Sequence, residues 1–252
     1  STSTVGLQTP VCVCVCVCVC VCVCVCNRWL LTAAQTCCGL ETRRPSKFLG
    51  HMLTGFLVAS TGQLLIESRT AFTSPLGEVF WVGTAGFDAT NAVVCFQDSA
   101  DSNKGKCSHL GLSGTGITPG TAVEFEAGTT EGISVATFDA NNAVVCFRDA
   151  DDSNKGNCVY LGLSGTTIAP ETAVGFGLTG IDIDYISVAA FDPNNAVVCY
   201  QDASDSKKGK CVHLRLVGIT ITAASPIEFE AQESYDVSVA AFDATNAAVC
   251  YR

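Results

Sequence analysis

The sequence has little of the positive charge that nucleic-acid binding requires. Only 15% of its 252 residues are charged, with 14 Lys and Arg against 24 Asp and Glu, which gives a formal net charge of −10. A chain with this balance repels phosphate backbones, and it contains neither a basic stripe nor a row of stacking aromatics. We therefore expect no nucleic-acid partner. The hydrophobic share of 48% is too high for a disordered chain.

Catalytic signatures are also absent from the sequence. It contains no Ser-His-Asp order, no nucleophile elbow and no metal-binding pair. His109 and His213 occupy one repeat position, where the intervening unit has Tyr160, so they are interpreted as strand-face residues. Asp182 and Asp184 could in principle be the two carboxylates of a glycosidase. Because only one unit has them, we interpret them as residues of a surface turn. We expect a protein that is not an enzyme, with no catalytic residues, no cofactor and no metal site.

No Lys or Arg precedes residues 11–26, which are eight uninterrupted Val-Cys dipeptides. Such a run forms about 24 Å of helix, which is shorter than the roughly 30 Å hydrocarbon core of a bilayer. A signal peptide normally has a basic residue before its apolar core. Because GTG and TGT encode Val and Cys, translation of a GT repeat gives the same pattern, and a true β-strand is a further alternative. We treat residues 1–26 as low complexity, with a membrane contact only if residues 11–26 are a real segment.

Residues 27–63 have no counterpart in the rest of the chain. Trp29, Phe48 and Met52 lie in short apolar groups with weak helical spacing, which Gly39 and Pro45 interrupt. We expect an irregular or weakly helical linker here, followed by repeats over residues 64–252. The adjacent Cys37 and Cys38 are expected to be free thiols, or one of them to bond elsewhere.

A unit of about fifty residues repeats through the remainder of the chain. The motif Phe-Asp-x-x-Asn-Ala starts at Phe87, Phe138, Phe191 and Phe242. In the second unit, four strand-like pieces (133–138, 143–147, 158–163 and 167–176) are separated by turn-forming residues, with no helical stretch between them. This order predicts an all-β fold of tandem four-stranded antiparallel meanders.

The first and fourth strands of each unit differ in character. The first is built from small residues around Ser134 and Ser187, which suits a crowded position near a central axis. The fourth carries Pro119, Pro170 and Pro226, and proline belongs on an edge strand because it cannot donate to a ladder. A small inner strand and a proline-bearing outer strand resemble a blade of the β-propeller proteins. The resemblance covers residues 64–252 and implies a partial β-propeller with three complete blades plus fragments, of no identified propeller family.

The two ends of the repeat region are incomplete. Residues 64–72 align with a fourth strand, and residues 237–252 supply strands one and two of a further unit. Because propellers usually have four to eight blades, we expect a fragment of a longer protein, or separate chains that complete the ring by self-association. A four-bladed ring, closed by the first fragment pairing with the last, would lack its third strand.

Two cysteines recur in every complete unit, twelve positions apart. They lie at the end of the second strand and the start of the third, where the arms of a hairpin can bring them within disulfide distance. Recurrence of both partners favours disulfides over buried thiols, and a zinc site lacks any Cys-x-x-Cys. Disulfides imply the secretory pathway and an extracellular or cell-surface location. Cys250 aligns with the first member of each pair, and its partner would lie beyond Arg252. The candidate pairs are Cys95 with Cys107, Cys146 with Cys158, and Cys199 with Cys211.

The segment between the paired cysteines is polar in every unit. Its carboxylates and amides could ligate Ca²⁺, but a lysine lies inside each copy and the spacing differs from the known calcium loop. Solvated hairpin loops on one face also suit partner binding. We expect a secreted or surface module that binds protein or glycan through these loops. The alternatives are a fragment of a glycan-hydrolysing propeller enzyme and a calcium-dependent adhesive module. The loop candidates are Asp98, Asp101, Asn103, Asp149, Asp152, Asn154, Asp202 and Asp205.

Overall fold

The computed structural model describes residues 78–252 except 115 and 178–181, together with the backbone of four earlier strands. These strands are β1 (Val13–Val17), β2 (Val21–Val25), β3 (His51–Leu57) and β4 (Leu64–Ala71). The chain divides into two compact units, Ser1–Ser46 and Lys47–Arg252. In the first, β1 pairs with β2, so the described part of the Val-Cys run is extended. None of the helices in the described residues has the length and apolar character to cross a membrane.

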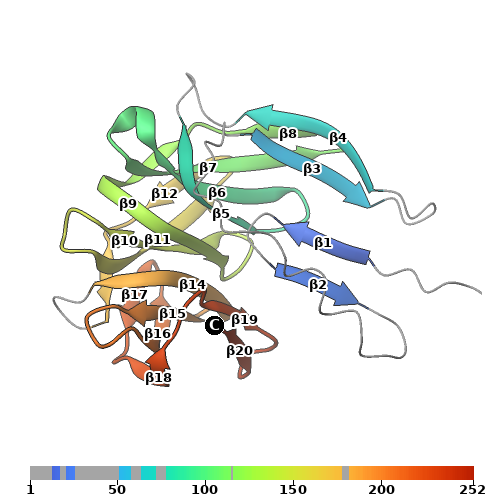
Figure 1. The fold of residues 1–252 in the computed structure, drawn as a ribbon. Helices are drawn as coiled ribbons and strands as arrows, with labels where there is room; N and C mark the ends of the chain where they lie inside the picture. Colours follow the sequence, from blue (N-terminus) through green and yellow to red (C-terminus); the bar gives the residue numbers. More distant parts are fainter. Residues whose placement is uncertain are drawn as a thin grey trace, which may run out of the picture. The chain divides into compact units, whose positions relative to one another are not determined.

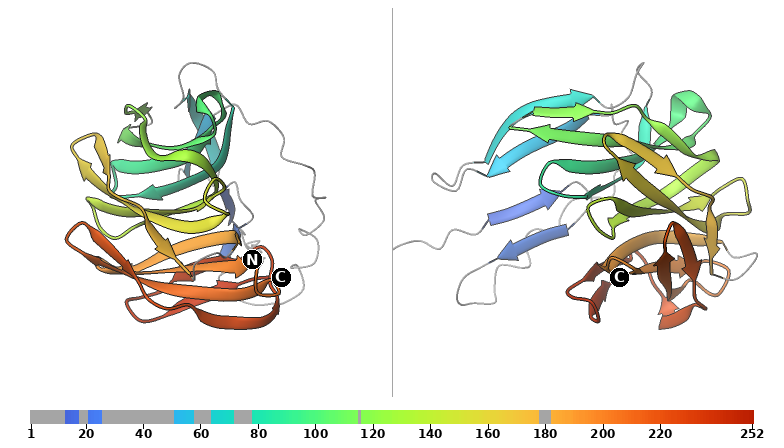
Figure 2. Two further views of the ribbon diagram at one scale, coloured as in Figure 1. Left: turned by 90° about the vertical axis from the view of Figure 1, so that its left-hand side faces the viewer. Right: turned by 180° about the vertical axis from the view of Figure 1, so that it is seen from behind.

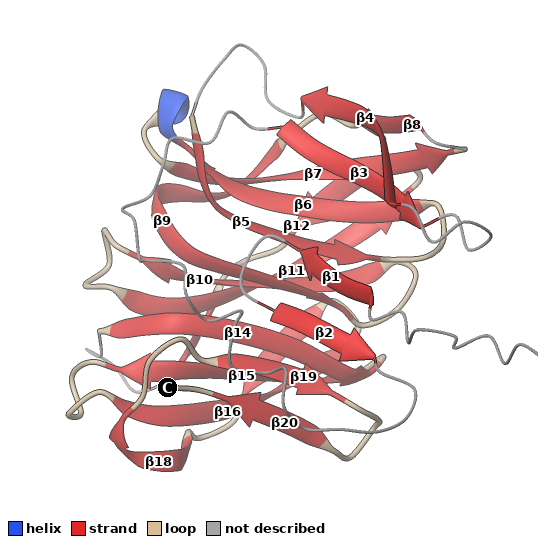
Figure 3. Ribbon diagram, turned by 45° about the vertical axis from the view of Figure 1, so that its right-hand side comes forward, coloured by secondary structure: helices blue, strands red, loops and turns tan. Residues whose placement is uncertain are grey.

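The second unit contains the repeats, and nearly all of its described part is β-strand (Figures 1 and 3). The first meander consists of β5 (Val79–Gly86), β6 (Asn91–Asp98), β7 (Lys104–Ser113), β8 (Gly116–Pro119) and the start of β9 (Val123–Thr137), with a short 3₁₀ turn at Ser99–Asp101. The second consists of the end of β9, β10 (Asn142–Asp149), β11 (Lys155–Ser164), β12 (Thr167–Pro170) and β13 (Val174–Phe176). The third consists of β14 (Ile183–Asp192), β15 (Asn195–Asp202), β16 (Lys208–Val217), β17 (Thr220–Ala223) and β18 (Ile227–Glu233). A fourth begins with β19 (Ser238–Ala241) and β20 (Ala247–Cys250). The predicted class of tandem antiparallel meanders is confirmed.

The fourth strand of each meander is in two pieces, where the sequence predicts one. β12 pairs with the end of β11 and β13 with its start, because the chain leaves the ladder just after Pro170. Pro119 likewise ends β8, opposite Leu110. Both prolines therefore lie on the outer strand of the meander, as expected of residues that cannot donate to a ladder.

The first strands of successive meanders contact one another, which explains their small residues. The Ser134 hydroxyl accepts a hydrogen bond of 3.0 Å from the backbone N–H of Val188, and Ser187 accepts the same bond from Val239. At Gly83, the counterpart in the first meander, an added Cβ would lie 3.0 Å from the Val135 side chain. Larger residues at these positions would separate the strands.

The apolar core lies between facing sheets, which Figure 2 shows from two sides. Between the first and second meanders, the Phe125 ring packs against Phe147 with 5.1 Å between centroids. Between the second and third, Phe176 packs against Tyr200 at 5.4 Å. Four-stranded sheets that face one another, with their first strands adjacent, form the arrangement of propeller blades, so the partial β-propeller is confirmed.

Strand β3 differs from the expectation of a linker or weakly helical segment over residues 27–63. Residues 51–57 are extended because they pair with β4, from His51 opposite Ala71 to Leu57 opposite Leu64. β4 covers nearly the range expected for a fourth strand, and it contacts β8 of the first meander. The rest of 27–63, including Cys37 and Cys38, lies outside the described residues, as does the part of 1–26 beyond β1 and β2.

Candidate binding surface

A disulfide closes the hairpin between the second and third strands of each complete meander. The Cα atoms of the bonded residues lie directly opposite each other, at 4.0, 4.1 and 4.0 Å in the three hairpins. Such short separations are typical of the non-hydrogen-bonded pairs of an antiparallel ladder, where side chains approach most closely. Three disulfides are compatible with an extracellular protein. Cys250 is free and exposed. The bonds join Cys95 to Cys107, Cys146 to Cys158, and Cys199 to Cys211, as predicted.

The polar loops beyond these disulfides are tighter than the sequence suggests. Strands β10 and β11 extend to Asp149 and from Lys155, into the predicted loop of residues 149–157. The turn itself places Ser153 at φ 57° and Asn154 at φ 60°, and a pair of left-handed residues is the type I′ turn that favours asparagine. The carbonyl of Asn154 accepts a hydrogen bond from Ile183 of the next meander at 3.2 Å. Asn103 holds the same place in the first meander.

The aspartates that open these loops shape the backbone. Asp149 accepts hydrogen bonds of 3.1 Å from the N–H groups of Asp151 and Asp152. Asp202 accepts the same bonds from Ser204 and Asp205. Asp98 begins the 3₁₀ turn by accepting from Ala100. Aspartate at this position therefore has a structural role in all three complete meanders.

Lysine side chains neutralise the carboxylates of the first and third loops. Lys210 Nζ lies 2.7 Å from both Asp202 and Asp205. Partial burial opposes the charge of Lys210, but hydrogen bonds to the two aspartates outweigh it and raise the pKa. Lys106 contacts Asp98 and Asp101 in the same way, at 2.9 and 2.7 Å. A lysine ammonium thus lies where a calcium ion would need to bind, and the described residues contain no cluster of three metal-ligating side chains.

A β-bulge lies in the first strand of each complete meander. In the second and third meanders this strand is also hydrogen-bonded to the turn of the meander before it, from Thr130 to Asn103 and from Ile183 to Asn154. Register shifts mark it between Phe80 and Gly83 in β5 and between Asp184 and Ser187 in β14. One residue in each bulge has a left-handed backbone, a conformation that costs a bulky residue about 1–3 kcal/mol. These residues are Trp81 (φ 51°), Gly132 (φ 58°) and Tyr185 (φ 53°), and Asp236 (φ 53°) has the same backbone conformation just before β19.

The two aromatic residues in these bulges are exposed. Trp81 has 53% of its surface open to solvent and Tyr185 has 40%. The Tyr185 ring meets Tyr235 edge-on at 5.9 Å between centroids. Lys207 Nζ lies 5.3 Å from the centre of the Tyr235 ring and 3.1 Å from its hydroxyl, and this hydrogen bond raises the pKa of Lys207. The sequence analysis did not identify Trp81 and Tyr185 as candidate site residues. The signal that could have found them is the repeat position that Trp81 shares with Gly132, because tryptophan rarely replaces glycine at a position that needs a left-handed backbone.

Arg148 ties the second meander to the third at the same end of the strands. Its guanidinium lies 2.7 Å from Asp184 and 3.6 Å from Asp182, and it also contacts Glu131. Burial raises the pKa of the Asp184 carboxyl, and repulsion from the two neighbouring carboxylates adds to this against the attraction of Arg148. The paired carboxylates noted in the sequence therefore share one cation. The counterpart of Arg148 in the first meander, Gln97, donates to the Thr130 carbonyl at 2.6 Å.

The Asp-x-x-Asn turns lie at the opposite end of the strands. Asp88 accepts from the N–H groups of Thr90 and Asn91, and these bonds, with others from both side chains, lower the pKa of Asp88 to about 2. The amide oxygen of Asn91 in turn contacts His109 Nε2 at 2.8 Å. This network links the first turn to the third strand, and the Asp88 side chain caps the turn.

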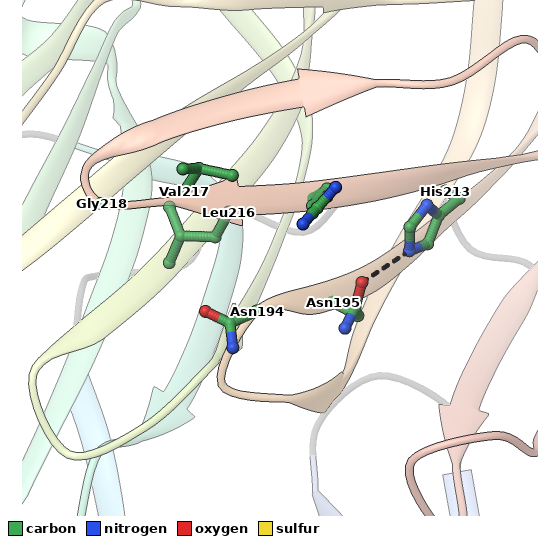
Figure 4. A pocket seen from close by; sticks show the side chains of 7 residues that line it. Asn194, Asn195, His213, Leu216, Val217 and Gly218 are labelled. Atoms are coloured by element: carbon green, nitrogen blue, oxygen red, sulfur yellow. Dashed lines mark hydrogen bonds between the residues drawn. The ribbon is translucent and has the colours of Figure 1, made fainter.

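A pocket of about 540 Å³ lies beside the corresponding turn of the third meander (Figure 4). His213 lines it and contacts Asn195 at 3.0 Å. The counterparts His109 and Tyr160 are only 2% and 7% exposed, because the next meander covers them, whereas His213 is exposed. The pocket is therefore part of the face on which a further meander would pack.

No protein-family model matches the chain, and no curated protein matches it. Similar solved structures include a leech intramolecular trans-sialidase complexed with 2,7-anhydro-Neu5Ac (13% identity, TM-score 0.42, covering 64% of this chain and 26% of that one). A triple arginine-to-alanine mutant of AofleA from Arthrobotrys oligospora has 14% identity and a TM-score of 0.45, covering 79% of this chain and 64% of that one. A mutant of Aleuria aurantia lectin in complex with Fucα1-6GlcNAc has 13% identity and a TM-score of 0.37, covering 63% and 66%. Likenesses this weak assign neither a family nor a ligand to the chain.

Proposed function

We propose that the protein is a non-enzymatic module that binds glycans at the end of the strands where the bulges and hairpin turns lie. The observation that carries the proposal is the exposure of Trp81 and Tyr185 in a left-handed backbone. Glycine at Gly132 satisfies the same bulge without strain, so folding alone gives no reason for a large ring. A ring held there against its backbone preference presents a flat apolar face, on which a sugar ring can stack.

Polar groups beside Tyr185 complete a surface suited to sugar hydroxyls. Lys207 and Glu233 both contact Tyr235, the ring that meets Tyr185 edge-on. The carbonyl of Asn154 accepts a hydrogen bond from the backbone N–H of Ile183, which is two residues before Tyr185. The side chain of Ser153, in the same turn, is exposed. An apolar face with a few polar groups around it is the usual composition of a small-molecule site. Among the loop candidates of the sequence, Asn154 is hydrogen-bonded to the strand that carries Tyr185.

The net negative charge of the chain favours an uncharged glycan as its ligand. A formal net charge of −10 repels sulfated and sialylated sugars, so we propose a neutral oligosaccharide as ligand. The contacts of Asp182 and Asp184 with one arginine support a binding rather than a hydrolytic role, because neither carboxylate is placed as a free acid or base.

Binding to a panel of immobilised neutral, sialylated and sulfated oligosaccharides tests the proposal. We expect retention on neutral glycans, and loss of retention in Trp81→Gly and Tyr185→Gly. The matched control is Phe242→Ala, because Phe242 is also an exposed ring but lies at the opposite end of the strands. Retention by both glycine variants, or equal loss in the control, would show that the bulge aromatics do not form the site.

The alternative functions are separated in the same experiment. We expect binding to be unchanged by EDTA, and the bound oligosaccharide to be recovered intact. Binding that requires added Ca²⁺ would favour the calcium-dependent adhesive module. Cleavage of the oligosaccharide that Asp184→Asn abolishes would favour the hydrolytic enzyme.

A further inference from the structure

The third hairpin turn carries a lysine where the first two turns carry an asparagine. Lys207 has the same left-handed backbone as Asn103 and Asn154, with φ values of 60°, 61° and 60°. Asparagine is among the residues that adopt this conformation most readily, and lysine is not. The backbone has the same role in all three turns, because each carbonyl accepts a hydrogen bond from the next meander. Folding alone therefore favours asparagine at this position.

The Lys207 side chain contacts Tyr235, which lies just before β19. The Lys207 ammonium lies 5.3 Å from the centre of the Tyr235 ring and 3.1 Å from its hydroxyl. Tyr185, the exposed ring of the third bulge, meets the same Tyr235 ring edge-on at 5.9 Å between centroids. Two residues with an unfavourable left-handed backbone, Tyr185 and Lys207, therefore contact one ring. At the position of Tyr235, the earlier meanders have Phe80, Glu131 and Asp184.

A charged donor and a charged acceptor flank the Tyr235 hydroxyl. Lys207 donates a hydrogen bond to this hydroxyl, which in turn donates to the Glu233 carboxylate. The Lys207 ammonium is 3.8 Å from Glu233, which is too long for a direct hydrogen bond, so the ammonium keeps donors for another partner. The hydrogen bond to Tyr235 raises the pKa of Lys207, so the ammonium stays charged. The Lys207 and Glu233 side chains are 45% and 58% exposed, so a ligand can reach both.

This pair of charged groups suits two hydroxyl groups on neighbouring carbons of one sugar ring. An ammonium only donates hydrogen bonds and a carboxylate only accepts them, so one hydroxyl can accept from Lys207 while the other donates to Glu233. Hydrogen bonds to charged groups are about twice as strong as those between neutral groups. The exposed Tyr185 ring offers an apolar face on which the same sugar can stack.

We propose that Lys207 and Glu233 bind a vicinal diol of a neutral sugar that stacks on Tyr185, which makes Lys207 a specificity-determining residue of the site. This inference rests on the proposed glycan-binding function and extends it, since it names the chemical group that is recognised. Tyr235 holds the two charged groups in place by bonding to both. Asparagine, which is shorter and uncharged, fits the turn but cannot replace the ammonium.

Retention on immobilised neutral oligosaccharides, with disulfides intact, tests the proposal. Each oligosaccharide is used in its free form and in a permethylated form, which keeps the sugar rings but has no O–H to donate. We expect Lys207→Asn and Glu233→Gln each to bind the free form about 10-fold or more weakly than the unmodified chain does. The unmodified chain should bind the permethylated form more weakly than the free form by a similar factor.

The matched control is Lys208→Asn, which removes the same charge from the next residue. Lys208 forms ion pairs with Asp205 and Glu228, at 3.3 and 3.2 Å. This variant should retain the free form as strongly as the unmodified chain does. The thermal midpoint of Lys207→Asn should match that of the control, because asparagine is the residue of the other two turns.

Three results would overturn this inference alone. Undiminished retention of Lys207→Asn, while Tyr185→Gly still loses binding, would show that Lys207 does not contact the sugar. Equal retention on the free and permethylated forms would show that the site works by stacking without a diol. An equal loss in Lys208→Asn would assign the effect to net charge. Failure of the unmodified chain to bind any neutral oligosaccharide would instead overturn the proposed function, and this inference with it.

Discussion

Because the backbone at Trp81 is left-handed, we expect the glycine variant at this position to be more stable than the alanine variant, which is the reverse of the usual order in a strand. At an ordinary strand position glycine is less stable than alanine by about 0.5–1 kcal/mol. At Trp81, alanine keeps the left-handed strain of about 1–2 kcal/mol, which glycine does not have. Both variants lose the same ring, so its partial burial cancels between them. We therefore expect Trp81→Gly to be more stable than Trp81→Ala by about 0.5–1 kcal/mol.

Thr84 supplies the matched position for this measurement. It lies in the same strand, is exposed and pairs with Val94 in regular register. There we expect the ordinary order, with Thr84→Ala more stable than Thr84→Gly by about 0.5–1 kcal/mol. Urea unfolding of all four variants, with disulfides oxidised, gives the two differences from the transition midpoints. If Trp81→Ala is as stable as Trp81→Gly, then Trp81 is not strained and the argument for a functional ring fails.

Three further predictions concern the scaffold. Replacing Cys146 and Cys158 together with serine should lower the unfolding free energy by roughly 3 kcal/mol, the chain-entropy value for a loop of this size, and calorimetry under oxidising conditions measures it. Gly105→Ala places a Cβ 2.5 Å from the Phe125 ring, so it should cost about 1–3 kcal/mol of overpacking in a denaturant titration. Hydrogen bonds, first from the Thr90 backbone, hold the pKa of Asp88 at about 2 in the folded state. Its contribution to stability is therefore present above the unfolded pKa of about 4 and is lost as the pH falls towards 2, and an NMR titration of the Asp88 carboxyl should give a midpoint near 2.

The repeat alone determined the meander and its cross-links. Two cysteines twelve residues apart, on either side of a polar segment, can lie opposite each other only if the strands form a hairpin, and the bond from Cys146 to Cys158 follows from that spacing. The small residues around Ser134 likewise indicated a crowded first strand, because side-chain size at a repeated position reflects the space available to it.

Other features depended on partners distant in sequence. From its sequence, the polar segment could be an ion site. In the structure Lys210 forms ion pairs with both Asp202 and Asp205, and these ion pairs depend on the register of β15 against β16. Likewise, β3 became a strand because β4 lies beside it, despite weak helical spacing in its own residues. Tertiary pairing outweighs local preference in both cases.

The sequence by itself determined the repeating unit, the order of its strands and the pairing of its cysteines, because all three depend on spacing along one chain. Only the tertiary structure decided that Trp81 and Tyr185 lie in bulges with a left-handed backbone. A bulge arises where the register of two paired strands shifts, so it is a property of the strand pair and not of either segment alone. The candidate binding surface is therefore visible only once the strands are paired.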